Sequence, residues 1–411
     1  MGQTLAMTPP EPTDPRPSVD LLDPAFHQGD PHPAYTWMRA NEPVYRDERN
    51  GLWAVSRHAD VHDVERRSDV FVSGRGYRSW WSPEENNMIA QDDPGHLAQR
   101  RLVSGRFTPR GVREHRTWLE AAIDDLLAPV ARRGELEVVG ELAAPLPCRL
   151  TARLLGFPED RWADIKGWSE RLMRIDAAPS DPSVATGLFE AIGEFAALLG
   201  EEVPARAGCP VHEAPDLLSV WVNATAEGEP LYGPDRLVHE TGLFIAGGAE
   251  TTRTVIAHGL RALADHPDQW DLMAEDPRVV TTGVEELIRW VTPLNNFFRT
   301  VARDDAIGGQ PVAEGDRVIL LYPSANRDEA VFDEPFRFDV TRSPNPHIAF
   351  GYGTHFCLGA NLARFELGLL FTELTRRFEA PTVIEELEVE PNVFARSARS
   401  FRAGLVPRAG A

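Results

Sequence analysis

The chain has 411 residues, 42% of them hydrophobic and 26% charged, proportions that are ordinary for a globular protein large enough for a substantial core. Its formal net charge of −21 disfavours nucleic acid and anionic membrane surfaces as partners. Three cysteines, Cys148, Cys209 and Cys357, are too few and too scattered for a disulfide framework, which fits a reducing compartment.

The N-terminal residues 1–16 are rich in proline, threonine and acidic residues, and they have neither an apolar core nor a positively charged start. We therefore expect a disordered tail here, without a signal peptide or a membrane anchor. The longest apolar stretches elsewhere fall far short of the roughly 20 residues that a membrane-spanning helix needs. The prediction is a soluble, cytoplasmic protein whose folded part covers residues 17–411.

The first predicted elements are short and are followed by a long irregular segment. They are a helix over residues 33–41, two strands over 43–46 and 51–56, and a helix over 59–67. The irregular segment, residues 73–93, carries Tyr77, Trp80, Trp81 and Met88 among glycine, serine, proline and asparagine. Long loops inside compact proteins tend to be functional. Large, mainly apolar side chains are costly to expose, so we expect this loop to cover something.

Helical patterning dominates from residue 96 to about 198, and its first part is unusually basic. Between residues 100 and 116 a single acid, Glu114, stands among six arginines. A run of charge is most often the solvated face of a helix. A surface for an acidic partner is the alternative. The six residues are Arg100, Arg101, Arg106, Arg110, Arg113 and Arg116.

A long helix predicted over residues 237–264 contains two adjacent glycines, Gly247 and Gly248, each costing roughly 1 kcal/mol relative to alanine. Thr251 lies four residues after Gly247, so its hydroxyl can bond to that carbonyl and open the helix. A widened groove would result, with Glu250 and Thr251 beside it. The alternative is a glycine pair used for packing and a threonine bonded within its own helix.

After this helix the pattern changes from helices to short strands. Glu286 and Arg289 stand three apart on one helix face, which alone indicates no more than a surface ion pair. Beyond Pro293, strands are predicted over 301–307, 311–312 and 317–322, separated by glycine-containing turns. We therefore expect a mainly α protein with a small β portion.

Near the C-terminus, Cys357 stands in a glycine-punctuated loop that runs into a predicted helix. Gly351, Gly353 and Gly359 can adopt backbone angles closed to other residues and let a flat ligand approach. Amides at the helix start can lower the pKa of the thiol. One thiolate with one open face is how iron is held inside a macrocycle, whereas no second cysteine lies near enough for zinc or an iron–sulfur cluster. The alternative is an ordinary buried cysteine.

The run Phe350-Gly351-Tyr352-Gly353-Thr354-His355-Phe356-Cys357-Leu358-Gly359 resembles the haem-binding loop of the cytochrome P450 superfamily, Phe-Gly-x-Gly-x-His-x-Cys-x-Gly, at all six specified positions. The run Gly247-Gly248-Ala249-Glu250-Thr251 resembles the oxygen-binding helix of that superfamily, with glutamate in place of the commoner aspartate. The resemblance extends in order over residues 20–405. It implies one large, mainly helical domain around a buried haem b, where length alone predicts two or three domains.

The resemblance also implies roles for individual residues. Cys357 would bind the haem iron, while Thr251 and Glu250 would deliver protons for oxygen cleavage. Contacts to the haem propionates are expected from His96, Arg100, Arg299 and His355. Glu286, Arg289 and Arg337 would form a buried network that braces the haem loop. The substrate pocket, with residues 73–93 as its lid, would be lined by Trp80, Trp81, Met88, Leu243, Phe244, Ala246, Leu294, Asn295, Phe297, Phe298, Val393 and Phe394.

The function implied is that of a haem-thiolate monooxygenase acting on a hydrophobic small molecule. Electrons would come from NAD(P)H through a reductase and a small acidic ferredoxin docked on the arginines of residues 100–116. Residues 30–39 and 354–367 resemble actinobacterial enzymes that hydroxylate steroid side chains, and relatives that tailor natural products share the same framework. The alternatives are a peroxide-driven haem-thiolate oxidase, which would typically lack the Glu250–Thr251 pair, and a haem sensor without turnover.

Overall fold

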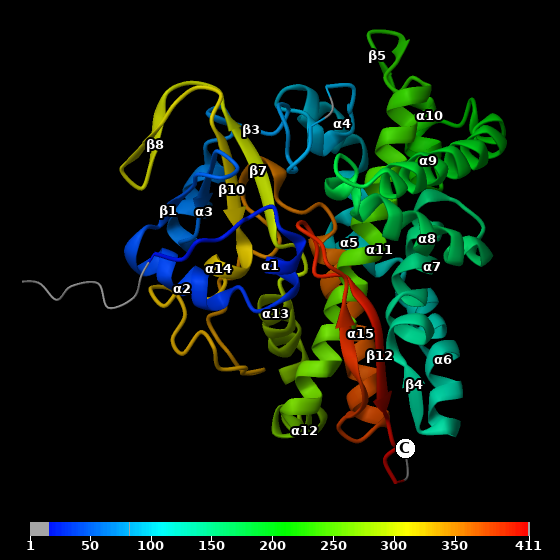
Figure 1. Cartoon of the computed structure of the whole chain (residues 1–411). Helices are drawn as coiled ribbons and strands as arrows, with labels where there is room; N and C mark the ends of the chain where they lie inside the picture. Colours follow the sequence, from blue (N-terminus) through cyan, green and yellow to red (C-terminus); the bar gives the residue numbers. More distant parts are fainter. Residues whose placement is uncertain (1–15, 82, 410–411) are drawn as a thin grey trace, which may run out of the picture.

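The computed structural model describes residues 16–81 and 83–409, a mainly helical molecule with a β-rich part at one side (Figure 1). The tail predicted over residues 1–16 lies outside the described residues except for Arg16. The Arg16 guanidinium pairs with the Glu42 carboxylate at 2.8 Å, so this residue belongs to the folded part.

The helices surround α11, which runs through the middle of the molecule (Figure 1). Its first turn carries Pro234, whose missing N–H costs nothing at that position. The bounds of the helices are α1 Pro24–Gln28, α2 His32–Asn41, α3 His58–Arg66, α4 Gly95–Val103, α5 Pro109–Arg113, α6 Arg116–Arg133, α7 Pro145–Leu155, α8 Trp162–Met173, α9 Pro182–Glu202, α10 Leu217–Asn223, α11 Pro234–Asp265, α12 Pro267–Glu275, α13 Val279–Val291, α14 Tyr322–Ala325 and α15 Ala360–Arg377.

The strands form a main sheet of order β1-β2-β10-β7-β3, a second sheet of order β11-β12-β4, and the two hairpins β5-β6 and β8-β9. In the main sheet β10 runs parallel to β2 and antiparallel to β7. The bounds are β1 Val44–Asp47, β2 Leu52–Val55, β3 Phe71–Val72, β4 Glu135–Glu137, β5 Thr225–Ala226, β6 Glu229–Pro230, β7 Asn296–Val301, β8 Asp305–Ile307, β9 Gln310–Val312, β10 Arg317–Leu321, β11 Thr382–Val389 and β12 Ala398–Gly404.

The mainly α class with a small β portion is confirmed, and several short elements differ from the prediction. The strand predicted over 301–307 is divided, because β7 ends at Val301 and the hairpin β8-β9 begins at Asp305. The sequence pattern missed β4, whose three residues pair with Arg402–Gly404 of β12, far along the chain. It also missed α10, which begins where the Asp216 carboxylate accepts a bond from the Ser219 amide.

One helix, Pro182–Arg206, is long and apolar enough by length and composition to cross a membrane. The prediction that every apolar stretch falls far short of that length is therefore wrong for this segment. The helix packs against α8 and α11. Its Glu194 accepts hydrogen bonds from Trp168 and Arg171 of α8. These contacts make it an element of the fold.

The largest hydrophobic core lies where α11 packs against α7, α8, α13 and α15. Gly259 of α11 allows a close approach, since a Cβ atom there would lie 3.0 Å from Leu287 of α13. A separate apolar cluster packs between one face of the main sheet and the helices α3 and α14. In the largest core, buried residues of α11 lie on both sides of the adjacent pair Gly247 and Gly248, Ile245 before it and Val255 after it.

Candidate active site

A cavity of about 720 Å³ lies between α11 and the loop that carries Cys357. Gly247, Gly248 and Thr251 of α11 line one wall, and Cys357 and Gly359 line the other. The sequence motifs at residues 246–252 and 350–359, about a hundred residues apart in the chain, therefore meet across one space.

Cys357 is held by a tightly folded loop. Its amide donates to the Phe350 carbonyl at 2.8 Å, and Gly351 and Gly353 have φ values of 67° and 70°, which only glycine adopts without strain. Burial raises the pKa of the Cys357 thiol, although bonds from the Gly359 and Ala360 amides act in the opposite direction. The amides at the helix start thus favour the thiolate as predicted, and burial outweighs them.

On the opposite wall, the Thr251 hydroxyl donates to the Gly247 carbonyl at 2.9 Å, as the spacing predicted. Gly248 lies against α7, where a Cβ atom would stand 2.6 Å from the Thr151 hydroxyl oxygen. This second glycine therefore serves a close packing of two helices. Gly247 has open space around it and lines the cavity.

Glu250 is buried, with 1% of its surface exposed, and does not belong to the cavity lining. Its carboxylate pairs with Arg253 at 2.6 Å, and Arg253 pairs with Glu170 of α8 at 2.7 Å. The Glu170 side chain is 39% exposed. A chain of charged groups thus leads from the residue beside Thr251 to the surface.

All four predicted propionate contacts, His96, Arg100, Arg299 and His355, line one end of the cavity. The rings of His96 and His355 lie 4.3 Å apart, and the buried Nε2 of His355 has no hydrogen-bond partner among the described residues. Burial, assisted by Arg299, lowers the pKa of His355 to about 2. The nearest carboxylate to Arg299 is Glu65, 3.7 Å away. Among the described residues Arg100 and His355 have no carboxylate partner, whereas His96 contacts Asp93 at 3.1 Å.

The Glu-Arg network is buried as predicted, but its third member is a different residue. Glu286 and Arg289 are fully buried and pair at 2.7 Å. The prediction for Arg337 is wrong: its side chain is 60% exposed and pairs with Glu334, and only its carbonyl accepts a bond from Arg289. Arg342, whose side chain is 10% exposed, contacts Glu286 at 3.3 Å instead. Four residues lie between the two arginines, and the family resemblance favoured the wrong one.

Most of the predicted pocket residues line the cavity, and three do not. Phe298 faces the opposite side of β7 from Phe297, because successive strand residues alternate between the two faces of a sheet. Asn295 is buried and donates to the Asn392 and Val393 carbonyls, which fixes the loop before β12. Val393 takes part through that carbonyl and lies outside the lining. The predicted pocket residues that do line the cavity are Trp80, Trp81, Met88, Leu243, Phe244, Ala246, Leu294, Phe297 and Phe394.

Sequence reasoning missed the contribution of α8 and α9 to the lining. Leu188, Ile192 and Phe195 of α9 stand four and three residues apart, which is the spacing of one helix face. That pattern was visible, but it also describes an ordinary core face. Phe189 lines the mouth and is 72% exposed, beside Trp80 and Trp81 in the same lining.

Three of the six arginines in the predicted docking patch have partners or line the cavity, and the other three are exposed. Arg100 lines the cavity, Arg106 donates to the Ala214 and Pro215 carbonyls, and Arg116 pairs with Glu120 at 3.0 Å. Arg101, Arg110 and Arg113 are exposed and have no ion pair within the described residues. Arg110 and Arg113 belong to α5, which packs against α15, the helix that follows Cys357.

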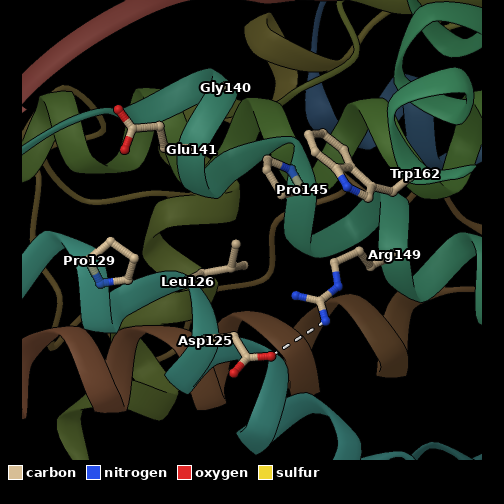
Figure 2. Close-up of a pocket in the computed structure, with 8 residues that line it drawn as sticks. All are labelled: Asp125, Leu126, Pro129, Gly140, Glu141, Pro145, Arg149 and Trp162. Atoms are coloured by element: carbon tan, nitrogen blue, oxygen red, sulfur yellow. Dashed lines mark ion pairs between the residues drawn. The ribbon is translucent and has the colours of Figure 1, made fainter. Parts of the chain in front are cut away.

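A smaller hollow of about 290 Å³ lies apart from these residues, among α6, α7, the start of α8 and the π-helical turn Val139–Ala143 (Figure 2). Trp162, Leu126 and two prolines form its apolar walls, and Asp125 faces Arg149 at 3.7 Å. None of the predicted site residues lines it. The chemistry of the molecule is therefore placed in the larger cavity.

Comparison with known proteins decides the family. The cytochrome P450 family model matches residues 201–396. Over 380 residues the chain is 40% identical to a steroid C26-monooxygenase of Mycobacterium tuberculosis, covering 91% of this chain and 93% of that protein. The chain belongs to the cytochrome P450 family. It is 31% identical to a linalool 8-monooxygenase of Pseudomonas putida, covering 95% of this chain and 99% of the relative.

Solved structures agree with this membership. A Mycobacterium marinum cytochrome P450 in complex with pseudoionone matches with a TM-score of 0.85 and 32% identity, covering 96% of this chain and all of that one. The resemblance stated from the motifs is thus confirmed. The protein is a cytochrome P450 monooxygenase, an enzyme whose family carries haem.

The residues present fit that haem. The cavity offers one thiol, from Cys357, which is the one cysteine among the lining residues that the structure describes. Among the described residues, Nε2 of His355 has no hydrogen-bond partner, and the Arg299 guanidinium has its carboxylate contact at 3.7 Å, to Glu65. Both groups line the cavity and would bind the two propionates. On the facing wall, Gly247 leaves open space beside Thr251. The donor set is therefore that of a thiolate-bound macrocycle.

Proposed function

We propose that this enzyme hydroxylates an apolar, elongated molecule of the steroid class, using electrons delivered by a ferredoxin. One observation carries the proposal: the Cys357 sulfur and the Thr251 hydroxyl stand on facing walls of one cavity whose lining is mainly apolar. When bound, haem supplies the oxidation of a C–H bond by dioxygen. The protein's own residues hold the substrate, exclude water and move protons.

Proton movement is the role proposed for Thr251 and Glu250. The Thr251 hydroxyl, bonded to the Gly247 carbonyl, is an acceptor fixed on the cavity wall and can orient a water there. Glu250 stands next to it and is linked through Arg253 to the exposed Glu170. Movement of Glu250 away from Arg253 would let its carboxylate take a proton from solvent water near Glu170 and pass it to a water held by Thr251. These contacts support Thr251 as the member of the pair that lines the cavity and Glu250 as its buried proton donor.

Electron delivery is proposed to occur through Arg101, Arg110 and Arg113. These arginines are exposed and unpaired among the described residues, and α5 lies against the helix that follows Cys357. An acidic partner docked there would approach the thiolate side of the cavity. Opposite charges would steer that encounter in a protein that otherwise repels acidic partners.

The substrate class rests on the shape and chemistry of the cavity. Its lining is formed mostly by leucine, isoleucine, valine and aromatic side chains, which favours an apolar guest. Lining residues recur along α11 from His239 to Thr251, a stretch of about 18 Å at 1.5 Å per residue. That length suits an elongated molecule. The similar proteins named for steroid and linalool oxidation support a terpenoid or steroid substrate. The cytoplasmic location stays a prediction.

The test of the proposed function begins with Cys357→Ala. We expect the reduced protein to lose the red-shifted carbon-monoxide Soret band that a thiolate ligand produces, because the alanine offers no sulfur. Cys148→Ala, which removes a buried cysteine outside the cavity lining, serves as the control and should keep the band. A band that survives in Cys357→Ala would remove the ligand assignment.

Comparison of electron sources separates this function from its alternatives. Product formed per NAD(P)H is measured with a ferredoxin system, and then with hydrogen peroxide alone. A monooxygenase needs the ferredoxin system, a peroxide-driven oxidase works without it, and a haem sensor forms no product in either. The presence of both Glu250 and Thr251 favours the first outcome.

A further inference from the structure

A polar cluster lines the mainly apolar cavity where the lid loop, residues 73–93, meets the first turns of α11. Tyr77, Glu85, Asn87 and His239 all line the cavity there. His239 lies twelve residues before Thr251 on α11, which places the cluster about 18 Å along the helix from the threonine. A polar group so remote from the reacting end has no part in the proton path.

The hydrogen bonds within this cluster leave acceptors unused. The Tyr77 hydroxyl and the Asn87 amide both donate to Oε1 of Glu85, at 2.6 and 2.8 Å. Burial, together with Glu85, raises the pKa of Tyr77 well above its usual value, so the phenol keeps its proton and remains a donor. Within the described residues no donor reaches Oε2 of Glu85. This oxygen is left to accept a bond from a guest.

His239 adds a second acceptor. Its Nδ1 lies 3.0 Å from Oδ1 of Asn86, an oxygen that can only accept, so the proton stands on Nδ1. In the neutral ring Nε2 is then an acceptor. The lid loop and α11 thus present two unused acceptors, one from Glu85 and one from His239, to the same cavity.

Charge in this part of the cavity also favours a particular guest. Arg78 is the lining arginine nearest in the chain, and it is paired with the buried Asp176 and stacked 3.9 Å from the Phe394 ring centre. The other lining arginines, Arg100 and Arg299, belong to the propionate end. A carboxylate guest would meet Glu85 without a free cation, whereas a hydroxyl group would donate to it.

We infer that Glu85, with His239, recognises a hydroxyl group at the end of the substrate remote from the oxidised carbon. The preferred substrate is therefore an elongated apolar alcohol, and the ketone of the same skeleton is a poor ligand because it brings no hydrogen to the acceptors. The inference rests on the proposed function, since it takes the cavity to be the substrate chamber. It adds the end group of the substrate and the residues that select it.

The test uses three probes that differ only at one carbon: cholestanol, cholestanone and cholestane. Binding to the haem-loaded enzyme is followed by the change in iron spin state. We expect cholestanol to bind at least about tenfold more tightly than cholestanone. Glu85→Gln, which replaces the free acceptor oxygen by an amide, should remove that preference and leave the affinity for cholestane unchanged.

The matched control is Glu84→Gln, because Glu84 also lines the cavity but makes no hydrogen bond within the described residues. It should keep the preference for cholestanol. Equal loss of affinity for all three probes in Glu85→Gln would assign Glu85 to the stability of the lid and overturn the inference. Equal affinity for cholestanol and cholestanone in the unaltered enzyme would overturn it as well.

A second series keeps failures distinguishable. If the cholestane series causes no spin-state change, dodecan-1-ol, 1-methoxydodecane and dodecane are measured, with the same order expected. If neither series changes the iron spin state in enzyme that retains its carbon-monoxide Soret band, the assignment of the cavity as the substrate chamber is wrong, and this inference fails with it. Loss of that band in unaltered enzyme overturns the proposed function itself.

Discussion

Thr251 is the residue whose single hydrogen bond has the clearest functional consequence. Its hydroxyl is held by the Gly247 carbonyl on the cavity wall, where it can orient a water. We expect Thr251→Ala to consume NAD(P)H without oxidising substrate, so that product per electron pair falls by about tenfold and hydrogen peroxide appears. The measurement is the ratio of product and peroxide to NAD(P)H consumed.

Thr254→Ala is the control for this variant. Thr254 is fully buried on the same helix and does not line the cavity. Coupling should be unchanged in it, although the protein loses some stability. If Thr251→Ala remained fully coupled, its hydroxyl would have no part in proton delivery.

The presence of Arg342 in the Glu286 network, at the place predicted for Arg337, leads to a prediction about stability. Arg342→Ala removes a cation from the fully buried Glu286 and should lower the free energy of unfolding by about 2 kcal/mol. Arg337→Ala removes an exposed side chain and should leave the melting temperature unchanged. Thermal unfolding of the two variants side by side measures the difference. A larger loss in Arg337→Ala would restore the original assignment.

At the scale of single residues, positions inside a motif could be predicted from the sequence, whereas the choice between two similar residues outside a motif could not. The run 350–359 has a fixed loop geometry, and His355 and Cys357 lie where the motif predicts. Arg337 and Arg342 carry the same side chain within six residues, and only the path of the backbone decides which one reaches Glu286. Phe297 and Phe298 are likewise equivalent in composition, and the face of β7 separates them.

Among the elements, α11 carries two adjacent glycines, Gly247 and Gly248, with different purposes. Gly247→Ala meets open space and should raise the free energy of unfolding by about 1 kcal/mol, the difference in helix propensity. Gly248→Ala places a methyl group 2.6 Å from the Thr151 hydroxyl oxygen and should lose that gain. Urea denaturation of both variants distinguishes them. An equal gain in both would show that Thr151 yields without cost.

Long elements with a repeating apolar face could be predicted, and short elements with distant partners could not. The helix predicted over 237–264 lies within α11, Pro234–Asp265, because apolar spacing extends over its whole length. β4 has three residues, two of them glutamates, and is a strand only because β12 lies beside it. The contribution of α8 and α9 to the cavity lining could not be predicted either. An apolar helix face has the same sequence pattern whether it packs against the core or lines a cavity.

For the molecule as a whole, the contrast between a net charge of −21 and the exposed arginines of α5 predicts how reduction depends on salt. Arg110→Glu combined with Arg113→Glu should slow reduction by a ferredoxin about tenfold at low ionic strength. The difference should shrink as salt rises, because screening weakens steering. Stopped-flow reduction at several salt concentrations measures this.

A double variant of equal charge change serves as control for the arginines of α5. Arg132 at the end of α6 and Arg278 before α13 are both exposed, and their replacement by glutamate alters net charge by the same amount. Reduction should remain near the rate of the unaltered protein. Equal slowing in both double variants would assign the effect to overall repulsion and remove α5 as the docking surface.

The two ends of the lid loop are fastened to different parts of the molecule. Arg317 of β10 holds the Arg78 and Ser79 carbonyls, while Glu240 of α11 accepts the Met88 amide at 2.9 Å. Between these anchors Trp80 and Trp81 stay 41% and 48% exposed at the cavity mouth. The two indole rings therefore stand between the apolar interior and solvent, on a segment that is fastened at both ends to the rest of the molecule.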